Sequence, residues 1–216
     1  MKAMRRFMFS MLCLMALGTS AQEKYCTSYS DFKANNWVEI DNPLQSKART
    51  QNQKFWNGGN DFQFTTGDKQ MDKTLKNNAL VVMMGDTMFV NCKNLEYKKR
   101  LFGKGYAKAC RFDGNKILIV NNPPADVSIG IMFGLIGAAI AESNRLEKQM
   151  CYVLHSDPLP GKKRFPLVLI DDAFMEDLLN NYNAPELLEK YNQAPKNKRN
   201  YANNVLPILE ELKLIE

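Results

Sequence analysis

Histidine is almost absent from this sequence, and no motif of a nucleophilic enzyme takes its place. His155 is the single histidine among 216 residues. The chain has no Gly-x-Ser-x-Gly motif and no recognised signature around a cysteine, so nothing indicates acyl-transfer chemistry. It also lacks a Cys-x-x-Cys pair, and a zinc site requires several histidine or cysteine ligands. We therefore predict no catalytic residue, no metal site and no cofactor, and a protein that is not an enzyme.

Two other short patterns fall short of an active site. Asp171 and Asp172 are adjacent carboxylates, but glycoside hydrolysis needs two carboxylates that flank the scissile bond, and no second acidic cluster partners this pair. Adjacent acidic residues before an apolar periodic run are typical of a helix N-cap. The Gly103-Lys104-Gly105 tripeptide lacks the spacing and the strand–loop–helix setting of a phosphate-binding loop.

The chain also lacks an apolar run long enough to cross a bilayer, which takes about 20 residues. The N-terminus instead has a basic start, an apolar core over residues 7–17 and small residues at 19–21. This order predicts a secretory signal peptide at residues 1–21, with the mature chain beginning at Gln22. Its removal lowers the formal net charge from +6 to +3, because it carries three basic residues and no acidic ones. We expect an exported protein that is periplasmic, associated with the outer membrane, or secreted.

Cysteine is scarce, and four cysteines follow the signal peptide. Proteins in oxidising compartments usually pair an even number of cysteines, so we expect at least one disulfide. Spacing does not choose among the three connectivities. In the alternative interpretation, some of these cysteines are small buried apolar side chains. The candidates are Cys26, Cys92, Cys110 and Cys151.

Basic residues exceed acidic ones, 29 to 23, and eight of them lie between Lys93 and Lys116. Glu96 and Asp113 are the acidic residues of that segment. A basic run can bind nucleic acid, but export argues against such a partner. Solvated lysines on edge strands are a commoner cause, because they discourage edge-to-edge pairing of sheets. We expect no nucleic-acid partner.

An uncharged run at residues 127–141 is predicted to lie in a Gly-rich helix at about 126–147. At helical spacing its small residues form one stripe beside a stripe of bulky apolar residues, which indicates close packing of two backbones. These 15 residues would span about 22 Å as a helix, short of a hydrocarbon core of about 30 Å, so a helix buried in the domain is favoured. The alternative is a glycine zipper that inserts in a membrane or associates with copies of itself. The small stripe consists of Gly130, Gly134, Gly137 and Ala141.

Two hairpins give the strongest local signals of secondary structure. The first joins residues 80–84 and 87–92 through a two-residue Gly-Asp turn, and the second joins residues 106–112 and 116–120 through Asp-Gly-Asn. Two more strands, at residues 149–155 and 164–170, follow the Gly-rich helix.

Helices are predicted for the rest of the C-terminal part. Asp171 or Asp172 caps the first, Pro185 opens the second, and residues 205–215 form the last, with Pro207 inside it. The order predicts an α+β fold with a mainly antiparallel sheet built from hairpins, an inserted helix and C-terminal helices. We divide the chain into the signal peptide (1–21), a polar N-terminal segment with short strands (22–78) and an α+β core domain (79–216).

Aromatic residues in the polar segment suggest one binding alternative. Trp56, Phe62 and Phe64 flank an Asn-Gly-Gly-Asn turn and are a candidate platform for stacking a sugar. Aromatic residues in such a setting are more often core residues of a small sheet.

Several segments resemble a known family. They are Gly85–Cys92 (GDTMFVNC), Phe102–Ala107 (FGKGYA), the Gly-rich helix, the strand Met150–Val153 and residues 172–191. From about residue 65 onward the chain resembles a family of small exported proteins of unknown function from Bacteroidota-type Gram-negative bacteria. The resemblance implies an envelope or secreted setting and carries no known activity. Asp86-Thr87-Met88 is also similar to the Asp-Thr-apolar sequence that this bacterial group uses for O-glycosylation, which makes Thr87 a candidate acceptor.

The sequence therefore predicts an exported, non-enzymatic envelope or secreted protein that acts as a binding or structural module. Its partner is open and could be a glycan, a peptide or another protein. One alternative is a membrane-associated or self-assembling protein that acts through residues 127–141. A second alternative is glycan binding through the N-terminal aromatic residues.

Overall fold

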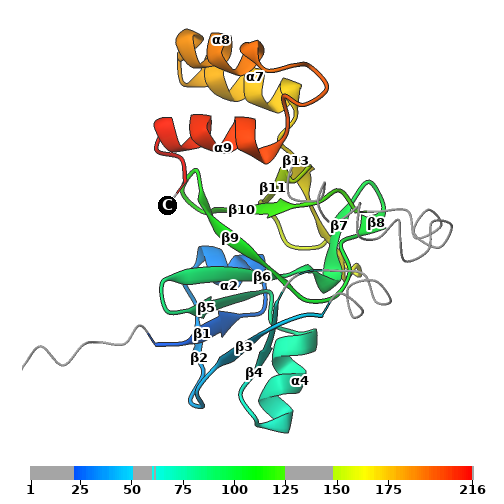
Figure 1. Ribbon diagram of the computed structural model, residues 1–216. Helices are drawn as coiled ribbons and strands as arrows, with labels where there is room; N and C mark the ends of the chain where they lie inside the picture. The colour runs from blue at the N-terminus through cyan, green and yellow to red at the C-terminus, as the bar shows by residue number, and fades with distance from the viewer. Residues whose placement is uncertain (1–21, 51–59, 61, 125–147, 216) are drawn as a thin grey trace, which may run out of the picture.

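The computed structural model of the protein describes residues 22–50, 60, 62–124 and 148–215. The predicted signal peptide (1–21) lies outside the described residues. So does the predicted Gly-rich helix (about 126–147), with Gly130, Gly134, Gly137 and Ala141, and so does Trp56. Figure 1 labels the helices and strands of the described part.

A ten-stranded sheet forms the body of the molecule. Its main path runs β13-β11-β10-β9-β6-β5-β1-β2, and all of its pairings are antiparallel. β4 joins β9 beside this path, and β3 pairs with β4. The strands are β1 (Lys24–Cys26), β2 (Val38–Glu39), β3 (Gln45–Ala48), β4 (Phe62–Thr65), β5 (Val81–Met84), β6 (Thr87–Asn91), β9 (Tyr106–Phe112), β10 (Lys116–Asn121), β11 (Met150–Leu154) and β13 (Val168–Leu169).

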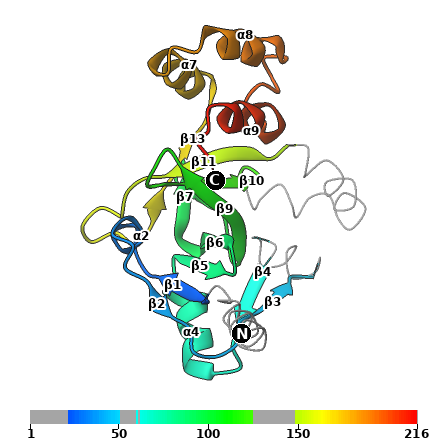
Figure 2. The ribbon, with the colours of Figure 1, turned by 90° about the vertical axis from the view of Figure 1, so that its left-hand side faces the viewer.

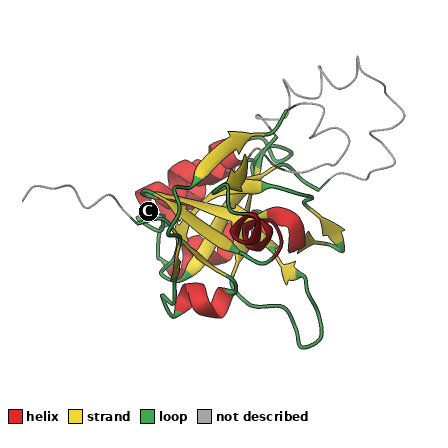
Figure 3. Cartoon of the chain, turned by 90° about the horizontal axis from the view of Figure 1, so that it is seen from below, coloured by secondary structure: helices red, strands yellow, loops and turns green. Residues whose placement is uncertain are grey.

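Within the described residues, a small sheet and five helices surround the main sheet, which Figure 3 shows crossing the middle of the molecule. The small sheet has the order β12-β7-β8. Its strands are β7 (Leu95–Tyr97), β8 (Arg100–Leu101) and β12 (Phe165–Pro166), and a 3-10 turn, η1 (Cys92–Asn94), precedes β7. The helices are α2 (Tyr29–Lys33), α4 (Lys69–Asn77), α7 (Asp172–Asn181), α8 (Pro185–Gln193) and α9 (Ala202–Glu211).

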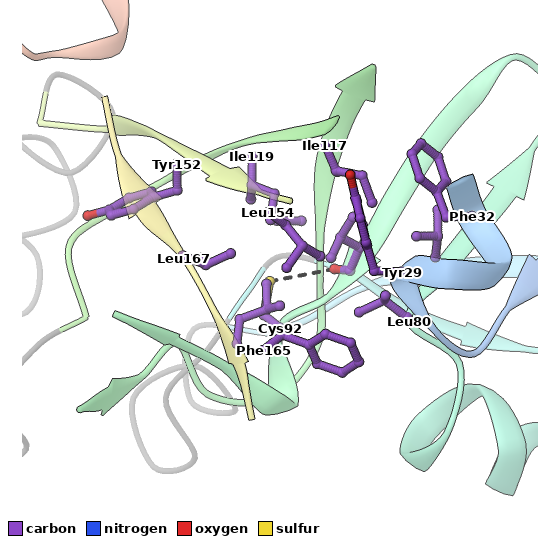
Figure 4. Packing of buried hydrophobic residues seen from close by; sticks show 14 of the residues in the cluster. Tyr29, Phe32, Leu80, Cys92, Ile117, Ile119, Tyr152, Leu154, Phe165 and Leu167 are labelled. Carbon is purple, nitrogen blue, oxygen red and sulfur yellow. Dashed lines mark hydrogen bonds between the residues drawn. The ribbon is translucent and has the colours of Figure 1, made fainter. Parts of the chain in front are cut away.

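One face of the main sheet packs against α2 and the small sheet. Alternate residues of β5, β6, β9, β10 and β11 point into this central cluster, together with residues of α2, β7 and β12. The centre of the cluster is shielded from solvent: Phe32, Ile117 and Leu154 have no exposed surface. Figure 4 shows ten labelled members: Tyr29, Phe32, Leu80, Cys92, Ile117, Ile119, Tyr152, Leu154, Phe165 and Leu167.

The opposite face of the sheet is covered at its two ends by different structures. At one end, α7, α8 and α9 cover β9–β11, with Leu118, Cys151 and Val153 pointing toward them. At the other end, α4 and the β3–β4 pair cover β5, β6 and the start of β9. Figures 1 and 2 show α4 and the three C-terminal helices at opposite ends of the molecule. Because both faces are covered, strands such as β10 and β11 are continuous apolar runs rather than alternating ones.

The predicted α+β class and antiparallel sheet are confirmed. Both hairpins form with the expected turns: Met84 pairs with Thr87 across Gly85-Asp86, and Phe112 pairs with Lys116. Gly85 has φ +59°, the left-handed conformation that a two-residue hairpin turn requires at its first central residue.

Two of the C-terminal helices, α7 and α8, begin where the sequence predicts, whereas α9 spans Ala202–Glu211 and so starts and ends earlier than the predicted 205–215. The Asp171 carboxylate accepts a hydrogen bond from the Phe174 backbone N–H (3.1 Å) and caps α7. Pro185 is the first residue of α8, and Pro207 lies inside α9.

The prediction of one strand over residues 164–170 is wrong in detail. Phe165–Pro166 pairs in parallel with β7 of the small sheet, whereas Val168–Leu169 pairs with β11 of the main sheet. Two short strands form instead of one because this segment crosses from one sheet to the other. The sequence also gave no prediction for α2 and α4, and β1 of the polar N-terminal segment pairs with β5 of the predicted core.

The predicted disulfide is absent among the described residues: none of Cys26, Cys92, Cys110 and Cys151 is joined to another cysteine. The sheet holds Cys26 and Cys92 on β1 and just after β6, with β5 between them. It holds Cys110 and Cys151 on β9 and β11, with β10 between them. Neighbouring strands lie about 4.8 Å apart, so cysteines two strands apart exceed the limit of about 7 Å between Cα atoms for a disulfide. Cys26, Cys92 and Cys151 are buried core residues, as the alternative interpretation has it.

Candidate functional site

A cavity of about 440 Å³ opens at the α4 end of the sheet. It lies between α4, β4, the residue that follows β3, the residues that end β6, and the start of β9. We call it the basic cavity. Its lining consists of Arg49, Gln63, Phe64, Thr65, Asp72, Lys76, Asn91, Lys93, Lys104, Gly105 and Tyr106.

A close backbone approach forms one wall of the basic cavity. The buried Arg49 guanidinium donates from Nη1 to the carbonyl oxygens of Lys104 (2.8 Å) and Asn60 (3.2 Å). Gly105 has φ +94°, and a Cβ there would lie 2.9 Å from the Asn60 carbonyl oxygen and 3.0 Å from that of Phe62. Only glycine fits this conformation and this gap without strain. The backbone at Lys104–Gly105 and the backbone at Asn60 and Phe62 are therefore held at a fixed spacing.

Two buried polar side chains hold the C-terminal end of α4 against the cavity. The Asn91 side chain, 6% exposed, donates from Nδ2 to the carbonyls of Leu75 (3.1 Å) and Ala79 (3.0 Å). The Tyr106 hydroxyl also donates to the Leu75 carbonyl, and burial raises the pKa of this phenol. Carbonyls at a helix end have no partner within the helix, so these bonds satisfy groups that would otherwise be buried alone.

Asp72 is the acidic residue of the lining, and its charge is already engaged. Its carboxylate accepts from the Thr65 hydroxyl (2.6 Å) and from the Thr66 backbone N–H (2.6 Å). These hydrogen bonds lower the pKa of Asp72, with the Thr65 hydroxyl as the largest cause. Asp72 therefore stays ionised at neutral pH while it ties β4 to the first turn of α4.

The cations of the lining outnumber this carboxylate. Among the described residues, Lys76, Lys93 and Lys104 form no salt bridge. Lys93 Nζ donates to the neutral Asn77 side-chain oxygen (2.7 Å), which leaves its charge uncompensated. A concave surface with a surplus of one charge attracts ligands of the opposite charge. The four cations are Arg49, Lys76, Lys93 and Lys104.

Aromatic rings form the deep part of the lining. Phe64 is 8% exposed and Tyr106 is 3% exposed, and their rings meet edge to face with centroids 4.8 Å apart. Phe89 lies behind them, 5.0 Å from Phe64 and 5.2 Å from Phe62. Phe62 and Phe64 thus pack into the sheet core, which supports the core interpretation of these rings over an exposed sugar platform.

The residues that the sequence offered for catalysis are not brought together. His155 is exposed at the end of β11. Asp171 caps α7, and Asp172 accepts a hydrogen bond from the Tyr191 hydroxyl (2.8 Å), so both carboxylates have structural partners. In the part of the chain that the structure describes, no three His, Cys, Asp or Glu side chains are grouped so as to hold a metal ion.

Burial also keeps three of the cysteines protonated. It raises the pKa of the Cys110 thiol to about 11 and the pKa values of Cys26 and Cys151 to about 12. Because the thiolate is the nucleophilic form, these thiols are poor nucleophiles at neutral pH. Thr87, the candidate O-glycosylation residue, is exposed at the β5–β6 turn.

The sequence did not indicate the basic cavity. Lys93 and Lys104 belong to the basic segment that was interpreted as solvated edge lysines, while Arg49 and Lys76 lie in the polar segment. Asp68, three residues before Met71 and two turns before Leu75, was a usable signal for α4, since its carboxylate caps that helix (2.7 Å to the Met71 N–H). No local signal links α4 to the end of β6.

Comparison with known proteins gives a family and no activity. None of the helices within the described ranges is both long enough and apolar enough to span a bilayer. Neither the curated proteins nor the solved structures give a match. The model of a protein family of unknown function (DUF6563) matches residues 24–216, and it carries nothing on export or bacterial group. The chain belongs to this family.

Proposed function

We propose that the mature chain is an exported, non-enzymatic protein of the bacterial envelope that binds a small anionic ligand in the basic cavity. The observation that carries the proposal is the charge of the lining: Lys76, Lys93 and Lys104 form no salt bridge among the described residues, and the one carboxylate, Asp72, already accepts three hydrogen bonds. The volume of about 440 Å³ falls within the range of cavities that hold small molecules.

Export and the absence of catalysis rest on the sequence. The predicted signal peptide at residues 1–21 and the resemblance to exported proteins of Gram-negative bacteria support an envelope or secreted location. The lack of a nucleophile motif supports a binding role, as do the exposed His155 and the buried, protonated thiols of Cys26 and Cys151.

The basic cavity favours an anion over the partners left open by the sequence. The rings of Phe62 and Phe64 are packed against Phe89, which weakens the case for glycan stacking on the N-terminal aromatic residues. Membrane insertion or self-association through residues 127–141 stays a separate prediction, because it concerns residues outside those described.

Calorimetric titration of the chain from Gln22 onward with phenyl phosphate tests the proposal. We expect binding that weakens at least about tenfold in Lys76→Gln/Lys104→Gln, since each lost ammonium removes part of the attraction for the anion. The matched control is Lys73→Gln/Lys108→Gln. It makes the same change in charge on α4 and β9 at exposed lysines outside the lining.

Equal loss of affinity in both double variants would mean that the net charge of the protein, rather than the basic cavity, attracts the ligand. No binding by the wild-type chain would contradict the proposal outright. Circular dichroism of each variant shows whether the fold is retained.

A further inference from the structure

We infer that the ligand of the basic cavity is a small amphiphilic anion, with an apolar ring or short acyl group attached to its carboxylate or phosphate. The inference rests on the proposed function and adds the chemical class of the ligand body. It follows from which lining groups still have hydrogen-bonding capacity and which do not.

Three polar side chains of the lining, those of Tyr106, Asn91 and Asp72, already form hydrogen bonds within the protein. The Tyr106 hydroxyl donates to the Leu75 carbonyl, and the Asn91 amide donates to Leu75 and Ala79 while its oxygen accepts from the Lys93 N–H (3.1 Å). The Asp72 carboxylate accepts from Thr65 and Thr66. A ligand body rich in hydroxyls would lose its water there without gaining these groups as partners, which is costly.

The surface that remains in the deep part of the cavity is aromatic. The rings of Phe64 and Tyr106 line it and are otherwise buried, with 8% and 3% of their residues exposed. The parts of these rings that stay exposed are apolar. Placing an apolar group against them removes apolar surface from water on both sides.

The free charges lie on longer and more exposed side chains. Lys76 and Lys104 are exposed and Lys93 is half-buried, and an ammonium group donates hydrogen bonds but cannot accept them. The matching ligand group is therefore one that only accepts, such as a carboxylate or a phosphate. A single inorganic anion would satisfy these lysines and leave the aromatic part of the 440 Å³ cavity filled with water.

Three probes that share a phosphate group test this inference on the wild-type chain from Gln22 onward. They are phenyl phosphate, glucose 6-phosphate and inorganic phosphate, titrated by calorimetry at one ionic strength and pH. We expect phenyl phosphate to bind at least about tenfold more tightly than the other two, because only its ring buries apolar surface. Intermolecular NOEs should connect the phenyl protons with the ring protons of Phe64 and Tyr106.

Each alternative result would contradict a specific part of the inference. Glucose 6-phosphate or inorganic phosphate binding as tightly as phenyl phosphate would overturn the apolar ligand body and leave the anion site standing. NOEs confined to residues outside the lining would overturn the placement. If none of the three probes binds, the proposed function itself fails. Phenol, titrated in the same way, is the uncharged control; if it binds as tightly as phenyl phosphate, the ligand does not need an anionic group.

Discussion

The face of the main sheet opposite α2 is covered at its two ends by helices that are held in place by different interactions. At the helical end, α7, α8 and α9 cover β9–β11 with apolar side chains at helical spacing, and Val205, Leu209 and Met175 have no exposed surface. At the α4 end, a single helix with one fully buried side chain, Leu75, is held by hydrogen bonds from Asn91 and Tyr106. The helical end is stabilised by apolar contacts of three helices, whereas at the α4 end hydrogen bonds between distant residues supplement a smaller apolar cluster.

This difference accounts for the position of the cavity. Apolar side chains on three helices interdigitate and leave little space, because protein interiors pack densely. Hydrogen bonds hold their two partners at a set distance, and space can remain beside them. At the α4 end, the Arg49 hydrogen bond and the close backbone approach at Gly105 set the distance between Asn60 and the loop before β9. We therefore expect variants at the two ends to separate stability from ligand binding.

The largest expected effect is at the helical end. Leu209→Ala should lower the free energy of unfolding by about 2–5 kcal/mol, because Leu209 is fully buried and its removal leaves a cavity. Chemical denaturation measures this change, and Leu206→Ala, half-buried on the same helix, should cost clearly less. Where Leu209→Ala remains folded, its affinity for phenyl phosphate should stay within about twofold of the wild type, since it lies far from the α4 end. A large loss of affinity in a folded protein would contradict the independence of the two ends.

An intermediate effect is expected at Gly105. Gly105→Ala should cost about 2–4 kcal/mol, because φ is +94° and the new Cβ would lie 2.9 Å from the Asn60 carbonyl oxygen. Gly114→Ala is the matched control, since its φ is +79° but no atom lies within 4 Å of the added Cβ. The difference between the two free energies of unfolding isolates the steric contribution. Equal costs would show that the wall of the basic cavity is not tightly packed.

The smallest effect concerns pH. The pKa of Asp72 is lowered in the folded protein by the Thr65 and Thr66 hydrogen bonds, so ionised Asp72 stabilises the fold. This contribution is fully present above the ordinary pKa of about 4 and is lost as the pH falls through the lowered pKa. Asp72→Asn should therefore be less stable than the wild type by about 1 kcal/mol at pH 7. The gap should narrow in more acidic solution.

Denaturation curves from pH 7 down to pH 3 measure this gap. Asp86→Asn, which removes a carboxylate at the exposed β5–β6 turn, provides the charge-matched control, and we expect it to leave stability unchanged. A stability difference for Asp72→Asn that does not change with pH would indicate that the Asp72 charge has no part in holding β4 to α4.

Local chemistry alone predicted much of the fold. Gly85-Asp86 and Asp113-Gly114 specify hairpin turns, Asp171 caps α7, and Pro185 opens α8, because each acts on neighbours within four residues. Helix α4 escaped prediction since its surface is polar and its apolar contacts reduce to Leu75 and part of Met71. The break of residues 164–170 into β12 and β13 depends on two sheets that lie far away in the sequence.

The sequence by itself determined the α+β class, the antiparallel hairpins and the starts of α7 and α8, because turn and cap residues act over a few positions. The tertiary structure decided where Arg49, Lys76, Lys93 and Lys104 meet, since they come from separate segments joined by sheet register and by long-range hydrogen bonds such as those of Asn91 and Arg49. It also decided that the cysteines stay apart, because sheet register holds Cys26 and Cys92, like Cys110 and Cys151, two strands from each other. Register depends on the burial of a whole sheet face and cannot be derived from spacing along the chain.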